Sequence, residues 1–113
     1  MTNVTSAPPK HRSVLTAFLD TSTSGSNEVV AAPGADSAIR VLSVVVVNGA
    51  TANTVKFMSA ANNKTSLFAL GINGGIVLPF TEHGWFQCNN GEALNINLSG
   101  ATAVGVTVNY MVL

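Results

Sequence analysis

Short stretches in which apolar and polar residues alternate fill most of this chain, and turn-forming pairs separate them. Residues 93–99 place leucine or isoleucine at every second position, which is typical of a strand with one buried face. Residues 103–112 alternate in the same way, with valine at most positions of one side. Asn-Gly pairs at 48–49, 73–74 and 90–91 tolerate positive φ and predict tight turns. The pattern therefore predicts an all-β chain.

A long apolar segment marks the centre of a predicted sheet. Residues 38–47, AIRVLSVVVV, are apolar on both alternating sets, so we expect both faces of this strand to be covered. Residues 13–20 fit either a strand or a short helix, and their Val, Thr and Phe favour the strand. Pro79 cannot donate to a ladder and is expected at an edge or a strand end. Further strands are predicted at residues 28–32, 54–60, 65–70, 76–80 and 85–88.

About eight strands at this spacing predict an antiparallel β-sandwich, with two sheets packed face to face. Jelly-roll and immunoglobulin-like topologies both fit, and alternation does not separate them. We assign the sandwich to residues 28–113. Residues 1–27 are predicted to form an extended N-terminal arm and lead-in segment, because Pro8-Pro9 interrupts their start and TSTSGSN at 21–27 is typical of a flexible loop.

Charge is scarce in this chain. Charged residues make up 9% of the sequence, against roughly 25% in ordinary soluble domains, and the formal net charge is zero. This balance excludes the basic footprint of a nucleic-acid-binding protein and favours a surface that is partly buried against neighbours. The positive cluster Lys10, His11 and Arg12 in the arm is an expected interface contact.

A membrane or secretory location is not predicted. The apolar runs fall short of the ~20 residues that span a bilayer. Lys10 and Arg12 are followed only by a short apolar stretch at 14–19, without a small-residue cleavage site, so we expect no secretory signal. The protein is therefore expected to be made in the cytoplasm, without a membrane partner.

The residues available for catalysis are few: two histidines, one cysteine and five carboxylates. His83 lies five residues before Cys88, which suggests a Cys–His pair only weakly, since TEHGWFQC also fits a surface loop followed by a buried strand with an inert thiol. No His/Cys cluster has metal-ligand spacing. The glycines of GINGGIV lack the Lys-Ser/Thr of a phosphate-binding loop. We expect no catalytic residue, no metal and no cofactor, and a single cysteine cannot form an intrachain disulfide.

Aromatic residues leave one binding alternative open. Trp85, Phe86 and Tyr110, with the many asparagines, could stack on and hydrogen-bond a sugar. The competing interpretation is that Trp85 and Phe86 belong to the core and rim of the sandwich.

Residues 73–108 carry a resemblance to a known group of proteins. Gly-Gly-x-Val-Leu-Pro-Phe at 74–80, Gly-Trp-Phe at 84–86, Gly-Glu-Ala-Leu-Asn at 91–95 and Thr-Ala-Val-Gly at 102–105 are similar to segments of small virion proteins of tailed bacteriophages. These are β-sandwich proteins of the head decoration, or cement, type.

The resemblance implies a non-enzymatic protein at the capsid surface of a virion. Its partners would be the major capsid protein, which it would bind and stabilise, and copies of itself in a homotrimer. The alternative is a receptor- or carbohydrate-binding module of a phage tail fibre or baseplate. No binding residues are carried over from the family.

Overall fold

The structure is a computed structural model that describes residues 13–113. The expected arm at residues 1–12, with Lys10, His11 and Arg12, lies outside the described residues. Residues 13–113 form strands and loops, without a helix that could cross a membrane. The strands are β1 (Leu15–Thr21), β2 (Gly25–Val30), β3 (Ile39–Asn48), β4 (Asn53–Ser59), β5 (Asn62–Asn63), β6 (Phe68–Leu70), β7 (Gly75–Leu78), β8 (Phe86–Gln87), β9 (Leu94–Leu98) and β10 (Val104–Val112).

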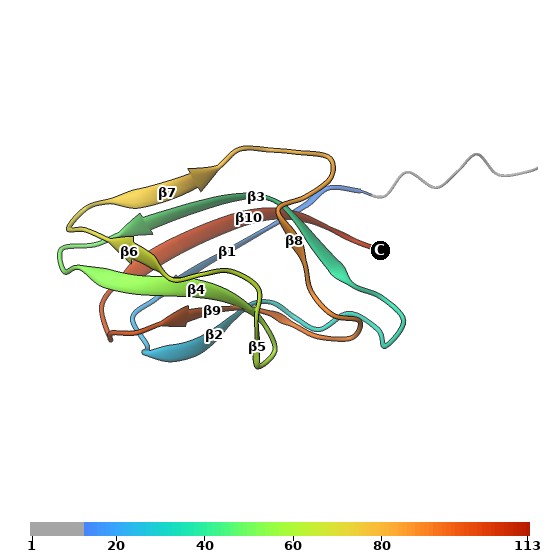
Figure 1. The fold of residues 1–113 in the computed structure, drawn as a ribbon, viewed down its shortest axis with the longest axis horizontal. Helices are drawn as coiled ribbons and strands as arrows, with labels where there is room; N and C mark the ends of the chain where they lie inside the picture. Colours follow the sequence, from blue (N-terminus) through green and yellow to red (C-terminus); the bar gives the residue numbers. More distant parts are fainter. Residues whose placement is uncertain (1–12) are drawn as a thin grey trace, which may run out of the picture.

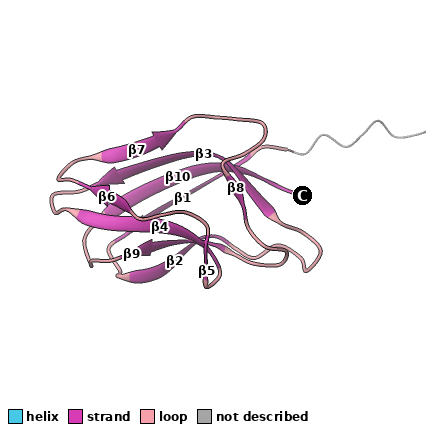
Figure 2. Ribbon diagram, viewed as in Figure 1, coloured by secondary structure: helices cyan, strands magenta, loops and turns pink. Residues whose placement is uncertain are grey.

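These strands form two antiparallel sheets that pack face to face, which confirms the predicted β-sandwich (Figure 1). Sheet A has the order β1-β10-β3-β7, and β8 also pairs with β3. Sheet B has the order β2-β9-β4-β5, and β6 also pairs with β4. Successive strands often change sheet, as Figure 2 shows for β3 and β4. Many neighbours within a sheet, such as β1 and β10, are therefore far apart in sequence, whereas β4 pairs with the nearby β5 and β6.

The core lies between the two sheets and is almost entirely aliphatic. Every second side chain is buried in β9 and in β10 as far as Val108, as the sequence predicts. Phe57 of β4 is fully buried, and its ring lies 5.6 Å from that of Phe86 on the opposite sheet. Burial of these apolar side chains stabilises the fold by roughly 25 cal/mol for each Å² of apolar surface removed from water. The fully buried apolar side chains include Ile39, Val41, Val44, Val46, Val55, Phe57, Leu94, Ile96 and Val108.

A β-bulge at Leu42 explains the doubly apolar pattern of β3. Ser43 pairs with Asn109, yet Val41 pairs with the next residue, Tyr110, so Leu42 is the extra residue. Before the bulge the odd-numbered side chains face the core, and after it the even-numbered ones do. The prediction that both faces are covered is wrong for the second half of β3, because its odd-numbered valines are exposed.

The N-terminal part of the described chain belongs to the sandwich. Residues 13–20 contribute the predicted strand, since β1 pairs with β10 along its whole length. The flexible loop predicted at residues 21–27 is shorter, because β2 already begins at Gly25 and pairs with β9. The domain boundary drawn between residues 27 and 28 therefore lies inside β2.

The Asn-Gly pairs serve different purposes. Asn73 has φ 56° and Gly91 has φ 74°, as expected for tight turns. Asn48 instead ends β3, and neither it nor Gly49 adopts positive φ. The chain then passes from sheet A to sheet B through bends at residues 50–51, so the positive-φ tight turn predicted at 48–49 is wrong. β7 ends at Leu78, directly before Pro79, which confirms the expected place of this proline.

Candidate interaction surface

The outer face of sheet A carries a row of apolar side chains. Phe18 lies opposite Thr107, Thr107 opposite Val45, and Val45 opposite Val77. Directly paired residues project from the same side of a sheet, with Cβ atoms about 5 Å apart. The row therefore crosses all four strands on the side away from the core. We call Phe18, Val45, Val47, Val77 and Thr107 the sheet A face.

These side chains are exposed to an unusual degree. Phe18 is 75% exposed, Val77 67%, Val47 55% and Val45 41%. Together they present roughly 400 Å² of apolar surface, which is within the range of the largest patch on a typical single protein, and such patches are often functional. The exposure of Val45 and Val47 follows from the bulge at Leu42, because it turns the odd-numbered valines of β3 outward.

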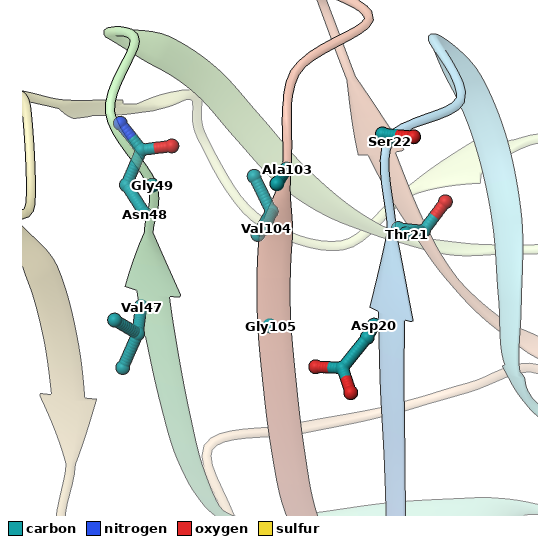
Figure 3. A pocket seen from close by; sticks show the side chains of 9 residues that line it. All are labelled: Asp20, Thr21, Ser22, Val47, Asn48, Gly49, Ala103, Val104 and Gly105. Atoms are coloured by element: carbon teal, nitrogen blue, oxygen red, sulfur yellow. The ribbon is translucent and has the colours of Figure 1, made fainter.

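A glycine hollows the sheet A face on one side of the apolar row. Asp20 pairs with Gly105, which pairs with Val47. The Asp20 and Val47 side chains lie on the strands to either side of Gly105, which has no side chain to fill the space between them (Figure 3). A shallow groove of about 260 Å³ follows from this gap and shares residues with a wider hollow of about 530 Å³ at the strand ends.

A polar row borders the apolar row on its other side. Thr16 donates a 2.8 Å hydrogen bond to Asn109 Oδ1, and Asn109 Nδ2 donates one of 2.8 Å to Ser43 Oγ. These groups satisfy one another across three strands. Asp20 is the one charged residue in the three rows, so the sheet A face is suited to packing against protein rather than to electrostatic recognition.

A second polar cluster lies at the far end of sheet B and fixes loops. The buried Ser59 hydroxyl donates a 2.6 Å hydrogen bond to Glu92 Oε1 and accepts one of 2.9 Å from the Asn89 backbone N–H. Asn62 and Asn89 also donate to the Glu92 carboxylate. These bonds, with that of Ser59 first, lower the pKa of Glu92.

Two buried asparagines hold the crossings between the sheets. Asn53 Nδ2 donates to Gly100 O at 2.9 Å and to Thr102 Oγ1 at 2.8 Å, and its Oδ1 accepts from the Gly100 N–H. Asn48 Nδ2 donates to the carbonyls of Thr51 and Gly71. The sequence predicts only a turn at Asn48. The neighbouring residues do not indicate that its side chain is buried.

The weak Cys–His candidate separates into two environments. His83 is exposed in the loop before β8. Cys88 is buried in the core, where burial raises the pKa of its thiol against the opposing effect of a hydrogen bond with Ser59. A buried thiol with a raised pKa is a weak nucleophile, as the alternative of an inert thiol predicts.

The three aromatic candidates for sugar stacking do not share one surface. Phe86 packs against the core beside Phe57, and Tyr110 is half-buried against the same core. Trp85 is exposed, and its Nε1–H donates a 2.7 Å hydrogen bond to Pro79 O. Trp85 and Phe86 are adjacent and differ in exposure, as the core-and-rim interpretation predicts.

The remaining sequence candidates serve as turn residues. Gly71 O accepts from the Gly74 N–H at 3.0 Å, so the GINGG segment closes a turn before β7. Within residues 13–113, no three His, Cys, Asp or Glu side chains gather where they could hold a metal ion. The sheet A face was missed by sequence reasoning, and the run of four valines at 44–47 was its only signal.

Comparison with known proteins adds one weak similarity. No protein family matches the sequence, and no curated protein matches it. A solved chain of the Bacillus endospore appendages, described as a novel family of disulfide-linked pili, superimposes with a TM-score of 0.49 at 9% identity. The match covers 98% of this chain and 96% of that chain. A similarity of this size indicates neither a family nor a function.

Proposed function

We propose that this chain is a non-enzymatic structural protein of a tailed-bacteriophage virion that decorates the capsid and stabilises its major capsid protein. The observation that carries the proposal is the sheet A face, an apolar surface that nothing in residues 13–113 covers. The largest apolar patch on a protein that works alone is itself about 300–600 Å² and is often functional, so a patch of this size is a candidate contact site.

The character of that surface supports a protein partner. The hydrogen bonds among Thr16, Asn109 and Ser43 satisfy part of the polar border internally, which lowers the cost of burying it against a neighbour. Asp20 lies at its rim, where a charge can remain in water. An apolar centre with a polar rim is the usual arrangement of a stable protein interface.

The resemblance of residues 73–108 to virion proteins supplies the class of partner. A shell built from many copies of one capsid protein offers the same docking site repeatedly, and a small neutral sandwich is suited to occupying it. The capsid surface as location and a homotrimer as assembly remain parts of this proposal.

Binding to capsids that lack this protein tests the proposal. Val45→Lys and Val77→Lys each place a charge in the middle of the sheet A face, and each should weaken capsid binding at least tenfold while the thermal midpoint stays within a few degrees. Leu67→Lys is the matched control, because Leu67 is 60% exposed in a loop before β6. It should bind as the wild type does.

Electron microscopy of decorated capsids would locate the chain directly. Density for the sandwich with the sheet A face against the shell supports the proposal. Absence of binding to capsids, together with glycan binding that Trp85→Ala abolishes, would replace it with the tail-fibre or baseplate module.

A further inference from the structure

The four lateral edges of the two sheets are not equally protected. In sheet A, β7 has four residues and ends directly before Pro79. In sheet B, β5 and β6 have two and three residues, and β2 contains a bulge between Glu28 and Val30. Short strands, proline, bulges and charge are the means by which proteins prevent other chains from pairing with a sheet edge. These three edges therefore resist pairing.

β1 has the fewest of these protections. It has seven residues, its register with β10 is uninterrupted, and it contains neither proline nor lysine. Its one charge, Asp20, lies near the C-terminal end of the strand. A long, regular and nearly uncharged edge presents unpaired backbone groups that another strand can bind.

Apolar side chains are open on both faces of this edge. Phe18 projects on the outer face at the middle of β1, and Val14 and Leu15 at its start are exposed as well. Ala17 and Leu19 face the core but are only half-buried, because within residues 13–113 β1 is the last strand at its end of sheet A. The edge is therefore incomplete in side-chain packing as well as in backbone pairing.

We propose that two copies of the chain pair through their β1 strands, antiparallel, about a two-fold axis at Phe18. The two copies of sheet A would then form one continuous sheet. This two-fold contact would replace the homotrimer of the proposed function by a dimer, and it does not depend on capsid binding.

The sequence of β1 is complementary to itself in this register. Phe18 lies opposite Phe18 of the second copy, an aromatic pair on the outer face. Ala17 lies opposite Leu19, a small residue against a large one on the core side. Asp20 lies opposite the uncharged Thr16, and the two Asp20 residues are four positions apart, about 13 Å along the strands and beyond the screening length at physiological salt.

Other assemblies are less favourable. An axis at Asp20 would place two carboxylates directly opposite each other, which is destabilising. A closed homotrimer needs β1 to meet a different edge of the next copy, and those edges are short, bulged or followed by proline. All seven residues of β1 pair only when the axis lies at Phe18.

The contact area sets the expected strength. Pairing of seven residues, with the side chains around them, covers about 500 Å² per copy, near the lower limit for specific interfaces. We therefore expect a reversible dimer that dissociates on dilution, with a dissociation constant on the order of micromolar.

Disulfide trapping tests both the contact and its register. Phe18→Cys places two thiols directly opposite each other across the two-fold axis, at the Cα separation that a disulfide needs. Mild oxidation should link it into a covalent dimer. The matched controls are Thr16→Cys and Val77→Cys, which should not link to themselves, and the wild type, whose Cys88 is buried.

A mixture gives a second, independent check of the register. Thr16→Cys and Asp20→Cys should form a mixed disulfide with each other, whereas Asp20→Cys alone should not form a disulfide-linked dimer. Sedimentation of the wild type should show a monomer–dimer equilibrium that Phe18→Ser shifts toward monomer by about tenfold.

Several results would overturn the proposal. They are a monomer at every concentration up to about 1 mM, a trimer, or oxidation that links the Thr16→Cys or Val77→Cys variant to itself while Phe18→Cys stays monomeric. Circular dichroism of each variant checks that the sandwich is retained, which the exposure of the substituted side chains leads us to expect. Capsid binding is measured separately with the Val45 and Val77 lysine variants, so failure of one proposal leaves the other standing.

Discussion

Ser59 and Glu92, 33 positions apart in the chain, are joined by a 2.6 Å hydrogen bond from a buried hydroxyl to a carboxylate. Ser59 ends β4, and Glu92 precedes β9, so the bond ties a strand of sheet B to the loop that leads back into the same sheet. Asn62 from β5 and Asn89 from the loop after β8 donate to the same carboxylate. The Glu92 carboxylate thereby joins β4, β5 and the loop after β8.

Stability should fall in acid because of Glu92. The hydrogen bond from Ser59 lowers its pKa, so the ionised form is favoured in the folded state. A lowered folded-state pKa stabilises the protein above the unfolded-state value of about 4.3, and this stabilisation is lost as the pH falls through the folded-state pKa. Urea denaturation from about pH 6 to about pH 2.5 should show a declining free energy of unfolding.

Glu92→Gln isolates this contribution. The variant should be less stable than the wild type at neutral pH, and its stability should decline less in acid. Glu28→Gln, at an exposed position of β2, is the control and should leave the pH profile as it is. If Glu92→Gln has the same dependence of stability on pH as the wild type, Glu92 is not the group responsible for the loss of stability in acid.

Cys88 should resist thiol reagents until the protein unfolds. The side chain is buried, and burial raises its pKa, so little thiolate is present and little of it is accessible. A maleimide or disulfide reagent at about pH 8 should label the native protein far more slowly than the protein in denaturant. Rapid labelling of the native protein at one equivalent would contradict the buried position.

The same residue predicts a loss of stability in alkali. A raised folded-state pKa means that the neutral thiol is favoured by the fold. Its stabilisation is complete below the unfolded-state pKa of about 8.5 and is lost as the pH rises through the folded-state value. Comparison of wild type and Cys88→Ala from about pH 7 to about pH 11 should show a steeper decline in the wild type.

Asn53 is expected to be the most sensitive polar residue of the described chain. Asn53→Ala leaves the Gly100 N–H and the Gly100 carbonyl without their partner, and the free energy of unfolding should fall by about 2–3 kcal/mol. Asn53→Asp keeps the acceptor but loses the donor, and it should be destabilised as well. Asn63→Ala, exposed in β5, should change stability by less than about 0.5 kcal/mol.

The sequence predicts the parts of this fold whose signal is local. Alternation in β9 and β10 reports burial directly, because each strand has one face on the core. In β3 the bulge at Leu42 changes which side chains face the core, from the odd-numbered ones to the even-numbered ones. A strand with one exposed face therefore has the apolar pattern of a strand that is buried on both faces. Periodicity alone does not show where a bulge lies.

Pairing over long distances has no local signal either. The sheet A face exists because Phe18 and Val45 are brought to opposite sides of β10, and that neighbourhood follows from topology. The partnership of Ser59 with Glu92 is hidden for the same reason. His83 and Cys88 are near each other in sequence and are therefore easily recognised as a possible pair, yet His83 is exposed and Cys88 is buried in the core.

Gly75 lies at the start of β7, in close contact with the backbone of β3. A Cβ atom there would clash with the carbonyl oxygen of Val46, a backbone atom that no rotamer change can move away. Gly75→Ala must therefore displace the start of β7, and we expect a loss of about 1–3 kcal/mol in the free energy of unfolding. Thermal or urea unfolding measures it.

Gly34 provides the matched control, because a Cβ atom there meets nothing within 4 Å and the residue does not have positive φ. Gly34→Ala should be neutral or stabilise by up to about 1 kcal/mol, since alanine restricts the unfolded chain more than glycine does. The displacement in Gly75→Ala should also disturb Val77, three strands from Phe18 on the sheet A face. Capsid binding should therefore weaken in this variant, whereas dimerisation through β1 should not. Equal stability of the two alanine variants would show that β7 can move without cost and that its pairing does not fix the position of Val77.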